Sequence, residues 1–268
     1  MNEEQANTVR RVFEIKQRNP ALSLSQIASI TKVQIKRILD RRDFYSGICH
    51  YGQMIDCCQD FSYCFNACKT YGIIGECGSG GWALSYTLTG REKVTNGQVI
   101  INGRHIDSKD LQKYSFYVGE GISSGGFNIG KNSVLKQLQA GIKISGRKDY
   151  SVEDIITLFG LSKDRLNYEV EELSWERWRA SIAIGFAYEK SVYCFPWCST
   201  SWVNDLILNS GIHRCFDILK QDGAIILLPT GNQQGVEYFI DEIVHLNNSR
   251  SLPSQTAMEI VEEFRRKK

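Results

Sequence analysis

The stretch "YGIIGECGSGGWALSYTL", residues 71–88, decides the fold. A short apolar run is followed by a turn rich in glycine and then by a segment that favours a helix. A phosphate-binding loop begins with this order of strand, glycine turn and helix, because the first backbone amides of the helix point at the anion. Such a loop ends in Lys followed by Ser or Thr, whereas the corresponding positions here are Gly81 and Trp82.

The composition is that of an ordinary globular protein, with 42% hydrophobic and 23% charged residues in a chain of 268. A net charge of +2 does not by itself favour nucleic acid or anionic lipid as a partner. No apolar run is long enough to span a membrane and no signal segment begins the chain, so we expect a cytoplasmic protein. The nine cysteines include no CxxC pair, and His50 is the only histidine near the cluster at 49–68, so we expect free thiols and no metal site.

Residues 1–43 are predicted to form a separate helical unit. Residues 3–18 place apolar side chains at helical spacing, and Asn19-Pro20 ends that helix. Residues 22–43 are predicted to form two shorter helices that resemble a helix-turn-helix. The unit holds nine Lys and Arg against five Asp and Glu. Contact with DNA is one interpretation of this extension, and a helical cap or a partner-docking segment is the other.

From residue 44 onwards, predicted strands and helices alternate. Strands are expected at 60–67, 71–75, 96–107 (a hairpin), 116–118, 191–195 and 224–228. Helices are expected at 82–90, 131–144, 152–159, 175–188, 205–219 and 236–245. This alternation predicts an α/β domain over residues 44–252, with a mainly parallel sheet and an antiparallel edge, followed by a helical tail at 253–268.

The motifs along this domain resemble, in order, those of the nucleotide-binding domain of ABC transporters. "GECGSGG" is similar to the phosphate loop of that family, "YSFYVGEG" to its glutamine loop and "VEELSWERW" to its signature motif. "SVYCFPWCST" stands where the family has a metal-binding Asp and a catalytic Glu, and "GAIILLPTGN" where a strand ends in the switch histidine. The resemblance implies a P-loop NTPase-like fold of ABC type with a helical signature subdomain, preceded by a small all-α unit.

The resemblance also assigns candidate site residues. Those of a vestigial phosphate loop are Gly75, Gly78, Ser79 and Gly80, with Tyr51 at the position that stacks adenine and Leu173 and Ser174 remaining from the signature. The charged and metal-binding positions are substituted: Gly81 replaces Lys, Trp82 the magnesium ligand, Pro196 and Trp197 the two acids, Gly231 the switch His and Glu120 the glutamine. We therefore expect no catalytic residue and no metal ligand, and at most weak binding of ATP.

The leading hypothesis is a non-hydrolysing ABC-type subunit rather than an enzyme. The resemblance implies a homodimer or heterodimer, pairing with an active ABC ATPase subunit and a membrane permease subunit at the inner face of the cell membrane. A DNA-binding regulator built on residues 1–43 is the alternative. A third interpretation is an active ATPase in which Lys69 or Lys131 enters the site.

Tryptophans fall at the degenerate motif positions: Trp82, Trp175, Trp178 and Trp197. If they are exposed together they form a partner interface, and if they are buried they fill the emptied nucleotide site.

Overall fold

The computed structural model describes most of the chain: residues 32–45, 53–92, 97–122, 132–147, 149–204, 211–246 and 266. Several predictions concern residues outside the described ranges. These are the helices predicted within residues 1–31, Tyr51, Lys131 and the tail at 253–268 apart from Arg266. Within the described part of the chain, no helix is both long enough and apolar enough to cross a membrane.

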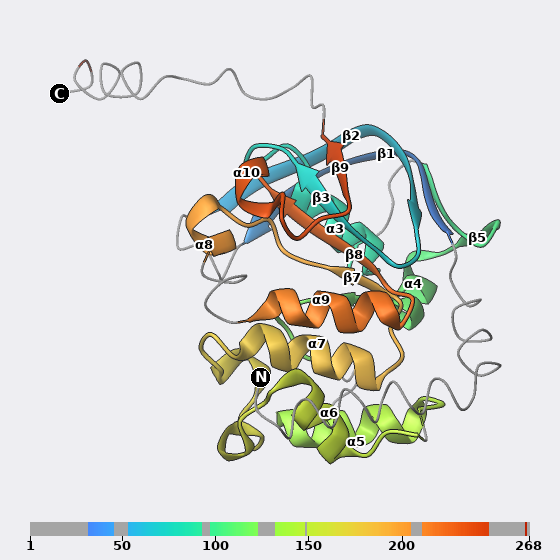
Figure 1. The fold of residues 1–268 in the computed structure, drawn as a ribbon. Coiled ribbons are helices and arrows are strands. Elements are labelled where there is room, and N and C mark those ends of the chain that lie inside the picture. The colour runs from blue at the N-terminus through green and yellow to red at the C-terminus, as the bar shows by residue number, and fades with distance from the viewer. Residues whose placement is uncertain are drawn as a thin grey trace.

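The centre of the domain is a parallel sheet in the order β6-β7-β8-β3-β9 (Figure 1). Its strands are β6 (Ser115–Tyr117), β7 (Val192–Cys194), β8 (Ile225–Thr230), β3 (Lys69–Ile74) and β9 (Glu242–His245). All four neighbouring pairs are parallel. Every residue of β8 is buried, as expected for a strand covered on both faces. The predicted parallel sheet is confirmed.

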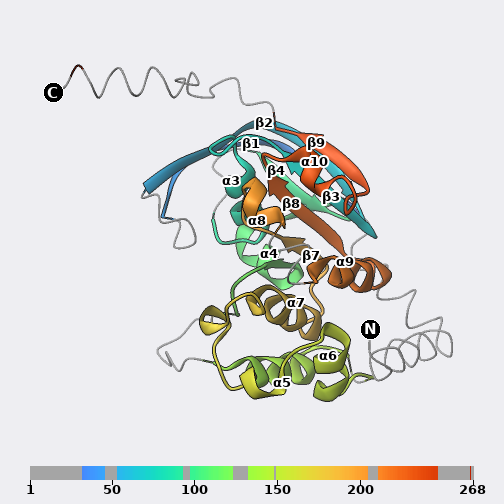
Figure 2. The same ribbon diagram turned by 60° about the vertical axis from the view of Figure 1, so that its left-hand side comes forward.

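A second sheet is antiparallel and has the order β2-β1-β4-β5. It contains β1 (Lys32–Tyr45), β2 (Gln53–Asn66), β4 (Gln98–Ile101) and β5 (Arg104–Ile106). The long strands β1 and β2 curve over the parallel sheet, and α3 (Gly81–Leu88) lies between the two sheets (Figures 1 and 2). The antiparallel strands therefore form a separate layer rather than an edge of the parallel sheet.

Strand β1 corrects the prediction of a helix at the end of residues 22–43. The strand pairs with β2 along its length and with β4 at its beginning. Residue 43, where the N-terminal unit was predicted to end, lies inside this strand. The helix-turn-helix therefore lacks its second helix, and contact with DNA loses its structural basis.

The helix predicted at 236–245 is also wrong. Residues Gln233–Val236 form the one-turn helix α10, and the chain then extends into β9, which pairs with β3. The apolar residues Val236, Phe239, Ile240 and Ile243 recur at helical spacing. The edge of β3 offers backbone groups with which residues 242–245 form hydrogen bonds as a strand. The spacing of the apolar residues gives no information about this pairing.

Helices cover the face of the parallel sheet opposite α3. Helices α7 (Arg177–Ala187) and α9 (Ile212–Gln221) lie nearest to the sheet, and α5 (Val134–Ile144) and α6 (Val152–Phe159) form the next layer (Figures 1 and 2). A capping box between Ser151 and Asp154 begins α6, and Gly160 ends it at φ 62°. The shorter elements are α4 (Ser108–Tyr114), η1 (Lys163–Arg165), η2 (Val170–Glu172) and α8 (Thr200–Asn204).

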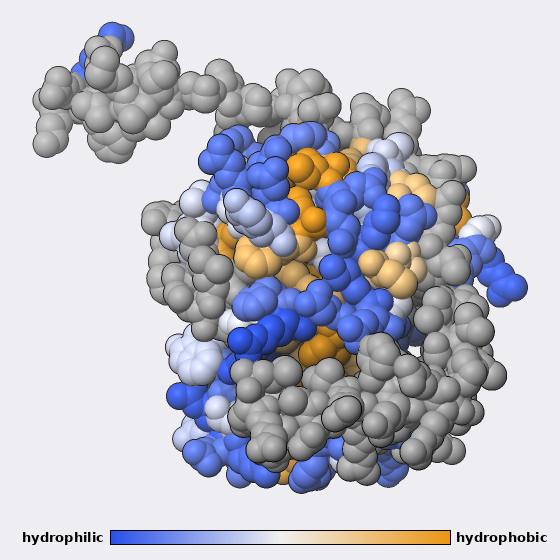
Figure 3. Space-filling view, in the orientation of Figure 1, coloured by the Kyte–Doolittle hydropathy of each residue, from blue (hydrophilic) through white to orange (hydrophobic). Residues whose placement is uncertain are grey.

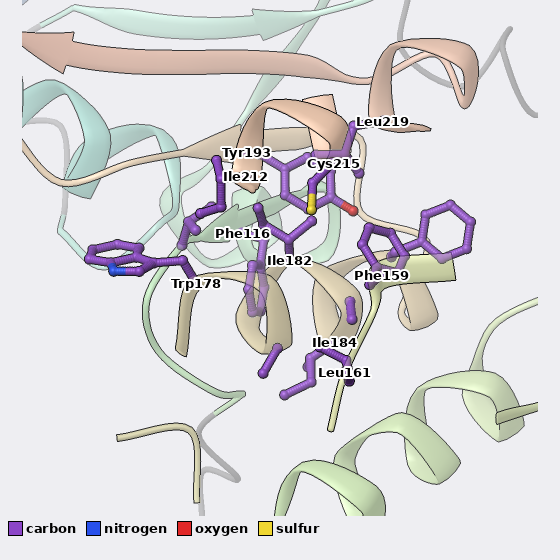
Figure 4. Packing of buried hydrophobic residues seen from close by; sticks show 14 of the residues in the cluster. Phe116, Phe159, Leu161, Trp178, Ile182, Ile184, Tyr193, Ile212, Cys215 and Leu219 are labelled. Carbon is purple, nitrogen blue, oxygen red and sulfur yellow. The ribbon is translucent and has the colours of Figure 1, made fainter. Parts of the chain in front are cut away.

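The sheet separates two hydrophobic cores, because successive side chains of a strand point to opposite faces. In β8, Ile226 and Leu228 belong to the core under α7 and α9, whereas Ile225 and Leu227 belong to the core around α3. Figure 4 shows the first of these cores, in which Trp178, Ile182 and Ile184 from α7 lie among residues from α9 and the sheet.

A buried ion pair fastens the connection between α5 and α6 to the turn before β8. Arg147 is 6% exposed and donates to both carboxylate oxygens of Asp222, one of them at 3.0 Å. Its guanidinium also lies 3.8 Å from the centre of the Phe186 ring. The helical layer is therefore joined to the sheet by a directional contact as well as by packing.

On the face seen in Figure 3, apolar residues appear as patches separated by hydrophilic ones. Large apolar side chains that are exposed include Ile144, Tyr168, Trp175 and Tyr238.

Candidate functional site

The glycine-rich loop leads from β3 into α3, as the sequence predicts. Gly78 and Gly80 have φ angles of 89° and 106°, which glycine adopts without steric cost. The amide of Gly75 donates to the carbonyl of Thr230 at 3.0 Å and so fastens the loop to the end of β8. The Ser79 hydroxyl donates to a carbonyl within the loop at 2.6 Å. The four predicted loop residues are thus together at the start of α3.

A carboxylate from another part of the chain lies on the amides of this loop. Asp56 in β2 is 1% exposed, and its two oxygens accept hydrogen bonds from the backbone amides of Gly80 at 2.6 Å and Ala83 at 2.8 Å. These amides begin α3, where a phosphate-binding loop presents donors to an anion. The sequence does not predict this role for Asp56, because its position opposite the loop depends on the pairing of β2 in the second sheet.

Trp197 packs on Gly81, the residue that the resemblance places at the family's lysine position. Its indole N–H donates to the carbonyl of Gly75 at 2.9 Å. A Cβ atom on Gly81 would lie 3.1 Å from Cδ1 of Trp197 and 3.0 Å from Cβ of Pro229. A Cβ atom on Gly231 would lie 3.3 Å from Cζ2 of the same indole. Because Gly81 and Gly231 have no side chains, the Trp197 indole fits against both of them. The resemblance predicts all three as substituted motif positions.

Trp82 faces the strand that leads to the glutamine position. It is 3% exposed, and its indole N–H donates to the Tyr117 hydroxyl at 3.0 Å. Burial raises the pKa of Tyr117 well above its usual range, so this phenol stays neutral. Glu120, predicted to stand at the glutamine position, forms a salt bridge of 2.5 Å with Arg91, whose guanidinium lies over the Tyr117 ring. Trp82, Tyr117, Arg91 and Glu120 thus form a continuous chain of contacts.

The signature-like residues divide between the core and the surface. Leu173 is buried and Ser174 is exposed. Trp175 is 50% exposed, with the guanidinium of Arg165 5.7 Å and that of Arg179 5.2 Å from its ring centre. This segment presents an exposed indole with a guanidinium near it from each of two arginines.

Glu176 turns away from the surface. It is 1% exposed, its carboxylate accepts a hydrogen bond from the backbone amide of Ser162, and Arg165 lies 3.8 Å away. Its negative charge is therefore directed into the helical layer rather than outwards from the beginning of α7.

The tryptophans serve different purposes. Trp178 is 5% exposed and stacks on Phe195 in the core, while Trp82 and Trp197 contact the glycine loop and its surroundings. Only Trp175 among these four is exposed. The four tryptophans therefore do not gather in one exposed patch.

Lys69 does not enter the loop. It begins β3, at the opposite end of the strand from Gly75, and forms a salt bridge of 2.8 Å with Glu242. Lys131, the other candidate, lies outside the described residues. Among the side chains that the structure describes, no group of three His, Cys, Asp or Glu residues is placed to hold a metal ion.

Comparison with known proteins agrees with the fold. The family model for ABC transporters matches residues 58–195, just over half of the chain. A methionine import ATP-binding protein of Geobacillus kaustophilus is 25% identical over 68% of this chain and 55% of its own length. Another, from Vibrio cholerae, is 23% identical over 85% of this chain and 66% of its own length. The chain thus spans less than two thirds of these relatives.

Solved structures show the same fold. An ATP-binding subunit of an ABC transporter superposes with a TM-score of 0.58 at 18% identity, covering 87% of this chain and 93% of the other. A component of an ABC transporter complex from Clostridium perfringens, cbiO1, gives a TM-score of 0.56 at 13% identity over 81% and 85% of the two chains.

Proposed function

This chain belongs to the ABC transporter family, and from that premise we propose that it is a non-hydrolysing ABC-type subunit that supports an active partner ATPase. The observation that carries the proposal is the position of Trp197, which packs on Gly81 where the family has its lysine. Phosphoryl transfer in such proteins depends on charges positioned around the phosphates and the metal ion. Here an indole, which offers one N–H donor and no metal ligand, occupies that position.

The surroundings of the loop support the same proposal. The indole N–H of Trp197 is used by the carbonyl of Gly75, and that of Trp82 by Tyr117. A triphosphate at this loop would meet the carboxylate of Asp56 rather than a lysine. The negative charges of the phosphates and of the Asp56 carboxylate would repel each other, and this repulsion is strong in a buried site. We therefore assign no hydrolysis to this chain.

We propose that the chain works in a heterodimer. In the family, the signature of one subunit faces the phosphate loop of the other. Ser174 and Trp175 are exposed here, Arg165 and Arg179 flank the indole, and Glu176 points inwards. The two guanidiniums beside the exposed indole are suited to the phosphates of a nucleotide held by an intact partner loop. With a membrane permease, such a pair forms a transport complex at the cytoplasmic face of the membrane.

The test is hydrolysis of Mg-ATP by the full chain alone and by the complex purified with it from its native cell. We expect background activity from the chain alone and measurable turnover from the complex. Replacing the phosphate-loop lysine of the partner by alanine should abolish that turnover, and Arg165→Ala in this chain should lower it. Turnover of about 1 s⁻¹ by the isolated chain, within the usual range of enzymes, would overturn the proposal.

A further inference from the structure

The contact between Asp56 and the glycine loop joins the antiparallel sheet to the start of α3. Asp56 belongs to β2 in the antiparallel sheet, and Gly80 and Ala83 belong to the start of α3. One carboxylate oxygen accepts the amide of Gly80 at 2.6 Å, and the other accepts the amide of Ala83 at 2.8 Å. The two amides are thus shared between the two oxygens of a single group.

The start of α3 has no negative charge of its own. Gly80 at its N-cap has no side chain to accept a hydrogen bond, and its first turn contains no acidic residue. Amides at a helix start favour an anion because they are unsatisfied donors and because the helix dipole is positive there. Asp56 supplies that anion from a buried position, 1% exposed, where a carboxylate is stable only with such donors.

We propose that the carboxylate of Asp56 is a tethered substitute for a nucleotide phosphate, which holds the loop in its anion-bound shape without any nucleotide. The inference rests on the proposed function and extends it to how the degenerate site keeps its form. A loop with a bound anion of its own has the same shape whether ATP is present or absent. The partner ATPase then meets a constant surface, and nucleotide regulates the pair through the partner alone.

A plain helix cap is the simpler explanation, and the two differ in one measurable respect. A cap requires only an acceptor of the size of a carboxylate. A phosphate substitute implies that the amides still form a phosphate site, which inorganic phosphate can enter once the carboxylate is removed. Asp56→Ala in the full chain creates that vacancy.

Asp241→Ala is the matched control. The carboxylate of Asp241 also accepts a backbone amide, that of Thr70 at 2.7 Å, but at the other end of β3 and away from the loop. Thermal unfolding is measured for the unmodified chain and both variants in sodium phosphate, sodium formate and sodium chloride at equal ionic strength. Phosphate is the probe for the proposed site, and formate is the probe for a site that fits only a carboxylate.

We expect phosphate to raise the midpoint of Asp56→Ala by about 2–3 °C at ten times its dissociation constant. The unmodified chain and Asp241→Ala should show no such shift. Asp56→Asn keeps the shape of the side chain without its charge, and covers the case in which the alanine variant does not fold. Phosphate displaces a neutral amide more readily than a carboxylate, so the midpoint of this variant should also rise.

Rescue by formate without rescue by phosphate would identify a cap and overturn the proposal, as would insensitivity of both Asp56 variants to phosphate. A phosphate shift in the unmodified chain would overturn it too, because the site would then be open. None of these results concerns hydrolysis. An unmodified chain without ATPase activity, combined with phosphate-insensitive variants, would leave the proposed function standing and remove this inference alone.

Discussion

Replacing Gly81 by lysine restores the residue that the family carries at this position, yet we expect it to destabilise the protein rather than to create a nucleotide site. A Cβ atom at this position would lie 3.0 Å from Pro229 and 3.1 Å from Trp197, closer than ordinary van der Waals contact. The rest of a lysine side chain adds to this crowding. Overpacking of this kind costs about 1–3 kcal/mol of unfolding free energy.

A double-mutant cycle attributes that cost to the indole. Trp197→Ala removes one of the two crowding side chains, so Gly81→Lys should cost at least about 1 kcal/mol less in that background. Gly146→Lys is the matched control, because Gly146 is exposed and a Cβ atom there would meet nothing closer than Glu189 at 3.4 Å. Its effect should stay within about 0.5 kcal/mol.

The assay is chemical denaturation of the four variants of the cycle and the control, followed by calorimetry with Mg-ATP. We expect no saturable heat from Gly81→Lys, since Asp56 still lies on the loop amides. If Gly81→Lys has the stability of the unmodified chain and binds Mg-ATP, then Trp197 does not occupy the space of the lysine and the argument is refuted.

Three further predictions concern the fold. Arg147→Ala should cost about 3–5 kcal/mol in chemical denaturation, since it breaks the ion pair that the buried Arg147 guanidinium forms with the Asp222 carboxylate, and an unchanged midpoint would contradict this. Glu242→Gln should cost less than about 1 kcal/mol at pH 7, because its salt bridge with Lys69 is partly exposed. Lys69 and Tyr63 lower the folded-state pKa of Glu242 below its ordinary 4.5, so its stabilisation is present above that value and is lost as the pH falls through the lowered pKa; a cost that persists at pH 2 would exclude this origin. Deletion of residues 1–45 should abolish cooperative thermal unfolding, because it removes the strand that pairs with both β2 and β4, whereas deletion of residues 1–31 keeps that strand; equal transitions for the two deletions would show that β1 is dispensable.

The sequence predicts an element correctly where the spacing of its apolar residues matches the way the element packs. The run before Gly75 is apolar and buried, and the glycine turn and α3 follow where the pattern places them. Gly160 ends α6 as predicted. In these segments the period of the apolar residues matches the element that packing requires.

Strand β1 was missed because its pairing is irregular. The register with β2 shifts between Ile35 and Ile38 and again between Ile38 and Asp40. Such bulges insert residues into a strand and interrupt its alternation of period two. The spacing of Ile35, Ile38 and Leu39 then matches a helix, although hydrogen bonds to two neighbouring strands determine the structure.

The site could be predicted from the sequence only in part. Substitution of the charged motif residues is visible in the sequence, and so is the retained set of loop glycines. The contacts of Asp56 and Trp197 with the loop are not, because each joins segments far apart in the chain. Gly81 and Gly231 illustrate the difference. In the sequence they stand where the resemblance predicts a lysine and a histidine, and in the structure each leaves space for the Trp197 indole.

The most direct test of a nucleotide site filled by the protein's own side chains is calorimetric titration of the unmodified full chain with Mg-ATP. We expect no saturable binding up to millimolar nucleotide, because Asp56 lies on the loop amides and Trp197 packs on Gly81 at the predicted lysine position. A dissociation constant near micromolar, a binding free energy of about −8 kcal/mol, would contradict it.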